Sequence, residues 1–268
     1  MKYTGIRAVP YATPHRIMQP HVARYEFSNQ VIEQATNVLD VACGTGYGAS
    51  ILKSKGYKKV FGVDLDWSAV VYANGNYGKA DGINFLQANG SNLPLDENSI
   101  DLITCFETFE HILDSHDFLI ELCRVLKPTG VLIISVPNAP IWAPFSTPPD
   151  LAVDDIRSGL GHKHNFSAKE FFQLLTQHFY SVSQYGQDFR RISYMSKLGR
   201  QLERIKIYLE YRLARYHVAQ LALGGSLADV LPQDDLNVTD IQWRVKEWDN
   251  QNYEPIFCVA VCRGKSVS

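Results

Sequence analysis

The segment from Asn37 to Gly48, N-V-L-D-V-A-C-G-T-G-Y-G, constrains the fold more than any other part of the sequence. Its apolar residues Val38, Leu39 and Val41 are typical of a buried strand, and a glycine-rich turn and a helix-compatible stretch follow directly. A turn this tight needs residues that tolerate unusual backbone angles and the close approach of a ligand. The N–H groups at the start of the helix then point at whatever lies above the strand end. The segment therefore predicts the first strand–turn–helix unit of a nucleotide-binding fold.

Two carboxylates accompany this turn. Asp40 lies near the end of the first predicted strand, where a carboxylate repels phosphate and attracts cations and hydroxyl groups. Asp64 ends a second apolar strand roughly twenty residues after Gly44, which is the spacing of the acidic residue that binds ribose hydroxyls in such folds. The pattern Gly44-x-Gly46-x-x-Ala49 also fits the dinucleotide fingerprint. Two coordinated features favour a nucleotide site over an ordinary turn with solvated acids.

Length and composition indicate a single large α/β domain, or one domain that carries an insertion. The chain has 268 residues, of which 46% are hydrophobic, enough for a sizeable core. The formal net charge of −2 argues against a nucleic-acid partner. The five cysteines contain no C-x-x-C pair and are typical of core residues in a reducing compartment. Neither a signal-peptide core near Met1 nor an apolar run of membrane-span length is present, so we expect a cytoplasmic protein.

Strand-like and helix-like segments alternate along most of the chain. The predicted strands are 38–41, 60–64, 83–87, 99–106, 131–136, 180–187 and 256–262, and the predicted helices are 21–32, 67–77, 118–126, 167–178 and a stretch that includes 49–52. Such alternation implies a parallel sheet with right-handed crossovers. We therefore predict an α/β fold: a Rossmann-like, mostly parallel, seven-stranded sheet with helices on both faces and a helical insertion before the last strand.

The predicted fold divides the chain into three parts. Residues 1–36 form an N-terminal arm and lid helix, residues 37–188 and 251–265 form the core, and residues 189–250 form a mainly helical insertion. The insertion is basic, and apolar residues recur in it at helical spacing: Leu198, Leu202, Ile205, Leu209 and Tyr216. This stripe suits a roof over the active site, a homodimer contact, transient binding to an anionic membrane, or simple packing on its own domain. We expect the helix around 199–216 to be a roof that sets substrate choice.

Further motifs follow the turn and Asp64 in a definite order. They are Asn89-Gly90 before Leu93-Pro94, Phe106-Glu107-Thr108-Phe109-Glu110-His111, and Arg124 to Gly130, preceded by Thr4-Gly5-x-Arg7 and His21-x-x-Arg24-Tyr25-x-Phe27. The whole set resembles class I S-adenosylmethionine-dependent methyltransferases, in particular bacterial O-methyltransferases of sugar, glycolipid and natural-product pathways. The resemblance covers roughly residues 4–187 and the final strand.

The resemblance implies a cofactor site for S-adenosylmethionine. Its residues are Tyr25, Asp40, Ala42, Gly44, Gly46, Asp64, Leu65, Asn89, Gly90, Ser91, Phe106 and Glu107. In such enzymes the glycine turn holds the methionine end, Asp64 would take both ribose hydroxyls, Leu65 would lie against the adenine, and Phe106 would lie beneath the sulfonium. Ala42 replaces the usual first glycine of the turn. Asn89 replaces the commoner aspartate, so it can both donate and accept at the adenine edge.

The motif Glu107-x-x-Glu110-His111 fits several interpretations. It resembles the E-x-x-E-H of ubiquinone-pathway O-methyltransferases, where the three residues can hold a divalent cation. Mg²⁺ would then be a second cofactor, although we favour a site without metal. Without metal, His111 faces the methyl acceptor at the strand end, and Glu110 lies beside it. The alternative is structural: Glu110 caps the next helix and His111 only packs.

A second histidine candidate, His162, precedes a predicted helix that begins at Ser167. In relatives a histidine in this neighbourhood faces the substrate cavity, and His162 matches that position better than His164. A surface loop histidine is the alternative. The catalytic candidates are therefore His111, His162 and Glu110, with His111 first as the general base.

Together these features predict in-line transfer of a methyl group from S-adenosylmethionine to a small-molecule hydroxyl, with a histidine as general base. Methylation of a small-molecule amine is the alternative within the same class. Two other classes stay open: an NAD-dependent oxidoreductase, and a non-catalytic partner that binds the cofactor. The chain after Pro137 offers little room for the catalytic domain of an oxidoreductase, and the histidines argue against a non-catalytic role.

Overall fold

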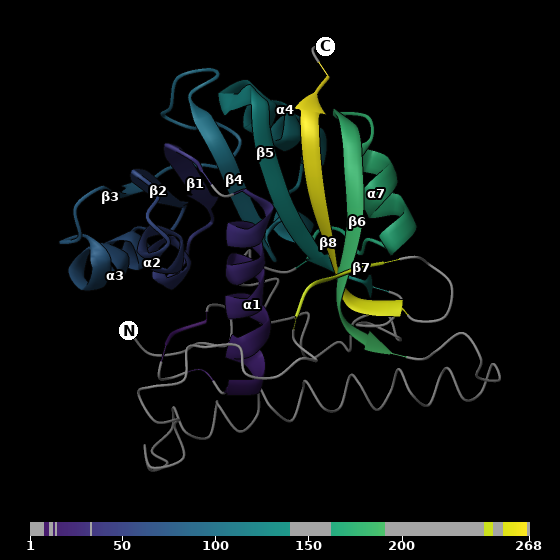
Figure 1. The fold of residues 1–268 in the computed structure, drawn as a ribbon, viewed down its shortest axis with the longest axis horizontal. Helices are drawn as coiled ribbons and strands as arrows, with labels where there is room; N and C mark the ends of the chain where they lie inside the picture. Colours follow the sequence, from purple (N-terminus) through teal and green to yellow (C-terminus); the bar gives the residue numbers. More distant parts are fainter. Residues whose placement is uncertain are drawn as a thin grey trace.

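The protein forms one β-sheet with helices packed on both faces, as the computed structural model shows (Figure 1). The structure describes residues 8–10, 13, 15–32, 34–139, 162–190, 244–248 and 254–266. In chain order its elements are α1 (His15–Val31), β1 (Asn37–Val41), α2 (Tyr47–Ser54), β2 (Lys59–Asp64), α3 (Trp67–Tyr77), β3 (Ile83–Gln87), β4 (Ile100–Phe106), η1 (Phe109–His111), α4 (Ser115–Val125), β5 (Leu126–Pro137), α7 (Ala168–Leu175), β6 (Phe179–Arg190), β7 (Lys246–Glu247) and β8 (Glu254–Lys265).

The strand order is β3-β2-β1-β4-β5-β8-β6-β7. Strands β1 to β5 pair in parallel, whereas β8 runs antiparallel to both β5 and β6. The order reverses between β1 and β4, which is the topological switch point where open α/β sheets bind their ligands. The predicted α/β class and mostly parallel sheet are confirmed.

The predicted number of strands is wrong, because the described sheet has eight strands rather than seven. The additional strand, β7, pairs with β6 through only Tyr185 with Glu247 and Gly186 with Lys246. Two exposed polar residues at a sheet edge carry no alternating hydrophobic pattern, so the sequence gives no signal for them.

Each face of the sheet has its own hydrophobic core. Leu39 belongs to a cluster that includes Phe118 of α4 and Phe171 of α7, whereas Val38 belongs to a cluster that includes Val22 of α1 and Val70 of α3. Neighbouring strand residues point to opposite faces, which is why both must be apolar in a sheet covered on both sides.

Two predicted helix starts are confirmed by their hydrogen bonds. Asp66 caps α3 and accepts a hydrogen bond of 2.8 Å from the Ser68 N–H. Ser167 and Glu170 form a capping box at the start of α7. The helix ends were predicted less well: α7 ends at Leu175 rather than near residue 178.

Helix α4 begins at Ser115, earlier than predicted, because Asp114 provides its N-cap and accepts a hydrogen bond of 3.0 Å from the Asp117 N–H. The alternative in which Glu110 caps this helix is therefore wrong. Glu110 lies instead in the short helix η1.

Helix α1 also begins earlier than predicted, at His15, and contains Pro20. Met18, Val22 and Tyr25 place it in the core on one face of the sheet. The predicted insertion, 189–250, lies outside the described residues apart from 189–190 and 244–248. Its proposed roles as roof, subunit contact or membrane contact stay predictions. Among the helices that the structure describes, none is long and apolar enough to cross a membrane.

Candidate functional site

The glycine turn between β1 and α2 adopts the backbone that the sequence predicted. Ala42, Gly44 and Gly46 have positive φ angles of 57°, 53° and 84°. Gly46 is also sterically required, because a Cβ atom there would lie 2.6 Å from the Cβ of Ala73. Ala42 thus occupies the first glycine position in a left-handed conformation, which a small residue adopts at a modest energetic cost.

Asp64 joins the end of β2 to this turn. Its Oδ2 accepts a hydrogen bond of 2.8 Å from the Gly44 N–H, and its Oδ1 accepts one of 2.9 Å from the Asp66 N–H. A carboxylate oxygen can accept more than one hydrogen bond, so these contacts orient the carboxylate while leaving acceptor capacity for hydroxyl groups.

Asp40 is buried beneath the turn. Thr104 donates to its Oδ1 at 2.8 Å, and the Tyr25 hydroxyl lies 3.2 Å from both of its oxygens. Burial raises the pKa of Asp40 to about 7, the hydrogen bonds from Thr104 and Tyr25 oppose this rise, and the charge of Asp64 adds to it. Burial also raises the pKa of Tyr25, as does the charge of Asp40.

These residues fit S-adenosylmethionine. Two carboxylates at the turn oppose a phosphate group but suit ribose hydroxyls and a positively charged amino group. Beside Asp64, Leu65 is 67% exposed and Trp67 is 61% exposed, so apolar surface is available next to the position expected for the ribose. An exposed apolar surface of this kind suits the adenine ring.

In the polar turn after β3, Asn89 and Gly90 make structural contacts that the sequence did not predict. The Oδ1 of Asn89 accepts a hydrogen bond of 3.0 Å from the Ser91 N–H, so this oxygen shapes its own turn. A Cβ atom on Gly90 would lie 2.6 Å from the Phe118 ring, which explains the glycine by packing against α4.

Glu107 follows β4 with a positive φ of 51°, a strained backbone for a residue other than glycine. Its Oε1 accepts a hydrogen bond of 2.8 Å from the Ser135 hydroxyl and lies 3.9 Å from the Arg24 Nη1. Burial raises the pKa of Glu107, while Arg24 and Ser135 oppose the rise.

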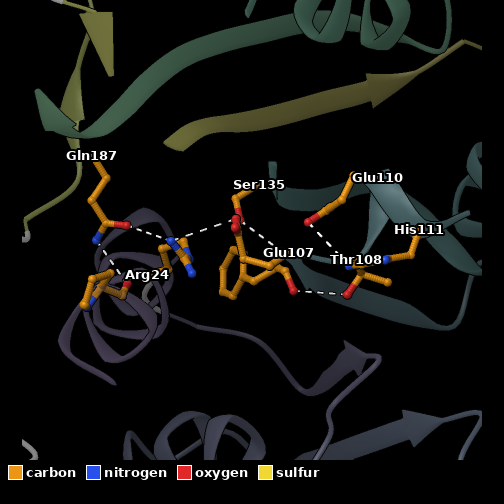
Figure 2. Close-up of polar contacts among 9 residues, drawn as sticks. Arg24, Glu107, Thr108, Glu110, His111, Ser135 and Gln187 are labelled. Atoms are coloured by element: carbon orange, nitrogen blue, oxygen red, sulfur yellow. Dashed lines mark hydrogen bonds and ion pairs between the residues drawn. The ribbon is translucent and has the colours of Figure 1, made fainter. Parts of the chain in front are cut away.

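The structure brings Glu110, His111 and His162 together at the end of β4. Their potential metal-ligand atoms all lie within 4.8 Å of one another. Glu110 Oε1 is 3.8 Å from His111 Nε2, and the His111 and His162 rings meet edge to face with centroids 4.8 Å apart. The predicted metal candidates were Glu107, Glu110 and His111. His162 takes the place of Glu107 in the observed group, because Glu107 turns towards Ser135 and Arg24 (Figure 2).

Backbone hydrogen bonds explain why His162 is here. The N–H groups of Lys163 and His164 donate to the Glu110 carbonyl at 2.7 Å and 3.0 Å. His164 itself stacks on Phe166, and its Nε2 lies 3.2 Å from the Leu113 carbonyl. Of the two histidines, His162 is therefore the one beside His111.

Glu110 is buried, and its Oε2 has no hydrogen-bond partner among the described residues. Burial raises the pKa of Glu110 well above its usual value, and the charge of Glu107 raises it further. The carboxyl group therefore keeps its proton to a higher pH than an exposed glutamate does.

No role of Arg24 or Gln187 was predicted from the sequence. Both are fully buried, and the Arg24 Nη1 donates a hydrogen bond of 2.7 Å to the Gln187 Oε1 (Figure 2). The signal in the sequence was an arginine between Val22 and Tyr25, on the apolar side of a predicted helix. Its partner, however, is 163 residues away along the chain.

Comparisons with known proteins agree with this geometry. Residues 39–134, from β1 into β5, match the family model described as a methyltransferase domain. The chain contains a class I methyltransferase domain. The predicted resemblance to class I S-adenosylmethionine-dependent methyltransferases is thereby confirmed.

Several curated relatives match the methyltransferase domain. A probable S-adenosylmethionine-dependent methyltransferase of Mycobacterium tuberculosis is 36% identical over 110 residues, which is 41% of this chain and 39% of the relative. An O-methyltransferase of Penicillium expansum is 28% identical over 138 residues, covering 47% of this chain and 50% of the relative. A ubiquinone biosynthesis O-methyltransferase of Rickettsia prowazekii is 36% identical over 105 residues, covering 38% of this chain and 40% of the relative. The chain thus spans about two fifths of the length of the M. tuberculosis relative.

Solved structures of methyltransferases have a similar fold. A methyltransferase of Thermotoga maritima, described as a possible histamine N-methyltransferase, has a TM-score of 0.56 at 18% identity and covers 93% of this chain and 92% of its own. A putative methyltransferase from Haloferax volcanii, in complex with the methyltransferase activator Trm112, has a TM-score of 0.55 at 17% identity. The match covers 94% of this chain and 93% of that chain. At these identities the likeness establishes the fold.

Proposed function

We propose that the methyltransferase domain transfers a methyl group from S-adenosylmethionine to a hydroxyl group of a small molecule. The observation that carries the proposal is the position of the Glu110–His111–His162 cluster. It lies at the end of β4, the strand next to β1, whose end forms the glycine turn with Asp40. The residues proposed to bind the cofactor and those proposed to accept the proton therefore follow adjacent strands at the switch point of the sheet. The O-methyltransferase names among the relatives support a hydroxyl acceptor.

When bound, the cofactor supplies a methyl group carried on a positively charged sulfur. The carboxylate of Asp64 would bind the ribose hydroxyls, and Asp40 would attract the amino group at the methionine end. Phe106, at the end of β4, would lie below the sulfur; its ring already packs edge to face on Tyr25, with centroids 5.0 Å apart. Such alignment of the two reactants can supply ~7–11 kcal/mol of the barrier.

The hydroxyl acceptor must also lose its proton. In the proposed mechanism His111 accepts it, a step that contributes ~10²–10⁴-fold in rate. Glu110 Oε1 lies 3.8 Å from His111 Nε2, so the carboxyl group is placed to orient the imidazole towards the acceptor. His162, next to His111, is the second candidate.

Cofactor identity is tested by calorimetry of S-adenosylhomocysteine binding. Asp64→Ala removes two hydrogen bonds to a charged acceptor and should weaken binding by ~2–4 kcal/mol. Asp96→Ala, which removes an exposed carboxylate elsewhere, is the control and should bind normally. Tight binding of NAD with no response to S-adenosylhomocysteine would contradict the proposal.

The base is tested by steady-state turnover. We expect His111→Ala to lower turnover at least ~100-fold, the lower end of the effect of a general base, while cofactor affinity stays the same. His164→Ala is the matched control, because the His164 side chain contacts Phe166 and the Leu113 carbonyl, and the substitution keeps the backbone hydrogen bond to Glu110. If His111→Ala has normal turnover, His111 is not the base, and the same measurement is then made on His162→Ala. Loss of wild-type activity on addition of a chelator would show instead that the cluster holds a divalent cation.

A further inference from the structure

Arg24 is a buried cation with an incomplete set of partners. Its side chain is fully buried, and its Cζ lies 5.0 Å from the centre of the Phe257 ring and 5.8 Å from that of Phe106. Both polar contacts of the guanidinium with described residues are made by Nη1. It donates a hydrogen bond to Gln187 and forms a 3.9 Å ion pair with Glu107.

The other two nitrogens of Arg24, Nε and Nη2, are buried and have no hydrogen-bond partner among the described residues. Burying a charged donor without a partner is costly, so such an edge calls for an acceptor. Nε and Nη2 share one edge of the planar guanidinium, and their N–H bonds point the same way. This is the edge that binds the two oxygens of a carboxylate in parallel.

The location of Arg24 favours the methyl acceptor as the source of that carboxylate. Phe106 ends β4, Phe257 of β8 pairs with Pro137 at the end of β5, and Gln187 of β6 pairs with Phe257. Two neighbours of Arg24, Phe106 and Glu107, are also predicted cofactor residues. Its contacts with Gln187 of β6 and Phe257 of β8, by contrast, lie away from β1 and β2, which carry the carboxylates Asp40 and Asp64, and these contacts favour the acceptor side.

The surrounding charges favour a singly charged anion. Glu107 lies on the Nη1 side of Arg24 and accepts its hydrogen bond from Ser135, so it does not occupy the Nε–Nη2 edge. Burial, aided by the charge of Arg24, lowers the pKa of His21, so this neighbour adds no positive charge near neutral pH. Arg24 supplies a single positive charge and Glu107 already lies beside it, so the two negative charges of a phosphate monoester would be less well balanced here than the one of a carboxylate.

We propose that the Nε–Nη2 edge of Arg24 binds a carboxylate of the acceptor, so that the enzyme methylates hydroxy acids. This inference rests on the proposed function and narrows its substrate class. Arg24 acts as a specificity-determining residue: it holds the acid group of the acceptor over β4 and β5 while the hydroxyl group faces the histidine cluster.

The test compares acids with matched neutral analogues on the wild-type protein. Hydroxybenzoates, hydroxycinnamates and uronic acids, each paired with its primary amide, are incubated with methyl-labelled S-adenosylmethionine, and transfer of label is measured. We expect kcat/KM for the favoured acids to exceed that of their amides at least ~10-fold, since a hydrogen bond to a charged group contributes about that much. This comparison needs no variant, so it does not depend on whether a buried arginine can be replaced.

Arg24→Lys keeps the positive charge but removes the pair of parallel N–H donors at Nε and Nη2. We expect it to raise KM for the favoured acid ~10- to 100-fold, to leave the amide unchanged, and to leave the affinity for S-adenosylhomocysteine unchanged. Arg263→Lys makes the same chemical change at an exposed position of β8 and should alter none of these values.

Two results would overturn the inference. One is a panel in which no acid is methylated in preference to its amide. The other is an Arg24→Lys variant that loses affinity for S-adenosylhomocysteine as strongly as for the acid, because the edge would then hold the carboxylate of the cofactor. If the wild-type protein binds S-adenosylhomocysteine but shows no preference for acids, this inference fails and the proposed function stands. If it does not bind S-adenosylhomocysteine, both fail.

Discussion

The buried carboxyl group of Asp40 makes the stability of the fold depend on pH, and Asp40→Asn should remove that dependence. Asp40 is 1% exposed, and burial is the main reason that its pKa rises from 3.8 to about 7. Asparagine has nearly the same shape, stays neutral at every pH, and can still accept a hydrogen bond from Thr104.

The sign of the effect follows from proton binding. Because the folded-state pKa is raised, the folded protein keeps this proton between pH 3.8 and about pH 7, whereas the unfolded chain releases it. The contribution of Asp40 to stability is therefore full below pH 3.8 and falls as the pH rises to about 7. A pKa difference of about 3, at 1.36 kcal/mol per pKa unit, corresponds to a loss of about 4 kcal/mol.

The assay is urea denaturation of the ligand-free protein in buffers from about pH 4.5 to about pH 8. The free energy of unfolding of Asp40→Asn, minus that of the wild type, should rise by about 3 kcal/mol over this range, because part of the loss already occurs below it. Asp96→Asn, which changes the net charge equally at an exposed position, is the control and should show no comparable rise. A difference that is constant with pH would refute the reasoning, because it would mean that Asp40 ionises alike in both states.

Two further predictions concern the local structure around the site. Ser167→Ala removes the capping box of α7 and should lower the free energy of unfolding by ~1 kcal/mol in urea titrations, whereas Glu170→Gln, which keeps a partner for the cap, should cost less. Gly46→Ala should cost about 2–4 kcal/mol, because it combines a left-handed backbone with a contact of 2.6 Å to Ala73. Gly56→Ala isolates the backbone component, since Gly56 has a φ of 96° and no atom within 4 Å of the added Cβ; equal losses for the two glycines would contradict the steric argument.

The sequence predicted the local geometry of the glycine turn and of Asp64 because its signals there are local. The strand, the glycine turn and the helix are consecutive between Asn37 and Ser54, and Asp64 ends the next strand. Parallel strands joined by right-handed crossovers bring such strand ends to the same edge of the sheet. The geometry of Gly44, Gly46 and Asp64 therefore agrees with the prediction.

The surroundings of Glu110 and His111 were predicted only in part, because their contacts join distant segments. Glu110 and His111 were recognised from their motif, yet the choice of His162 over Glu107 as their neighbour depends on backbone hydrogen bonds from Lys163 and His164. A spacing pattern cannot show that Glu107 takes a positive φ and turns its side chain away.

By itself, the sequence determined the alternating α/β order, the glycine turn, the carboxylates at the ends of the first two strands and the helix caps at Asp66 and Ser167, since each depends on residues close together in the chain. Only the tertiary structure decided that β8 lies between β5 and β6, that a two-residue strand extends the sheet, and that Arg24 meets Gln187 and Glu107. The physical reason is that hydrophobic periodicity records which face of an element is buried but not which other element covers it. That choice depends on packing across the whole sheet, and it placed a buried arginine over the half of the site proposed to hold the acceptor.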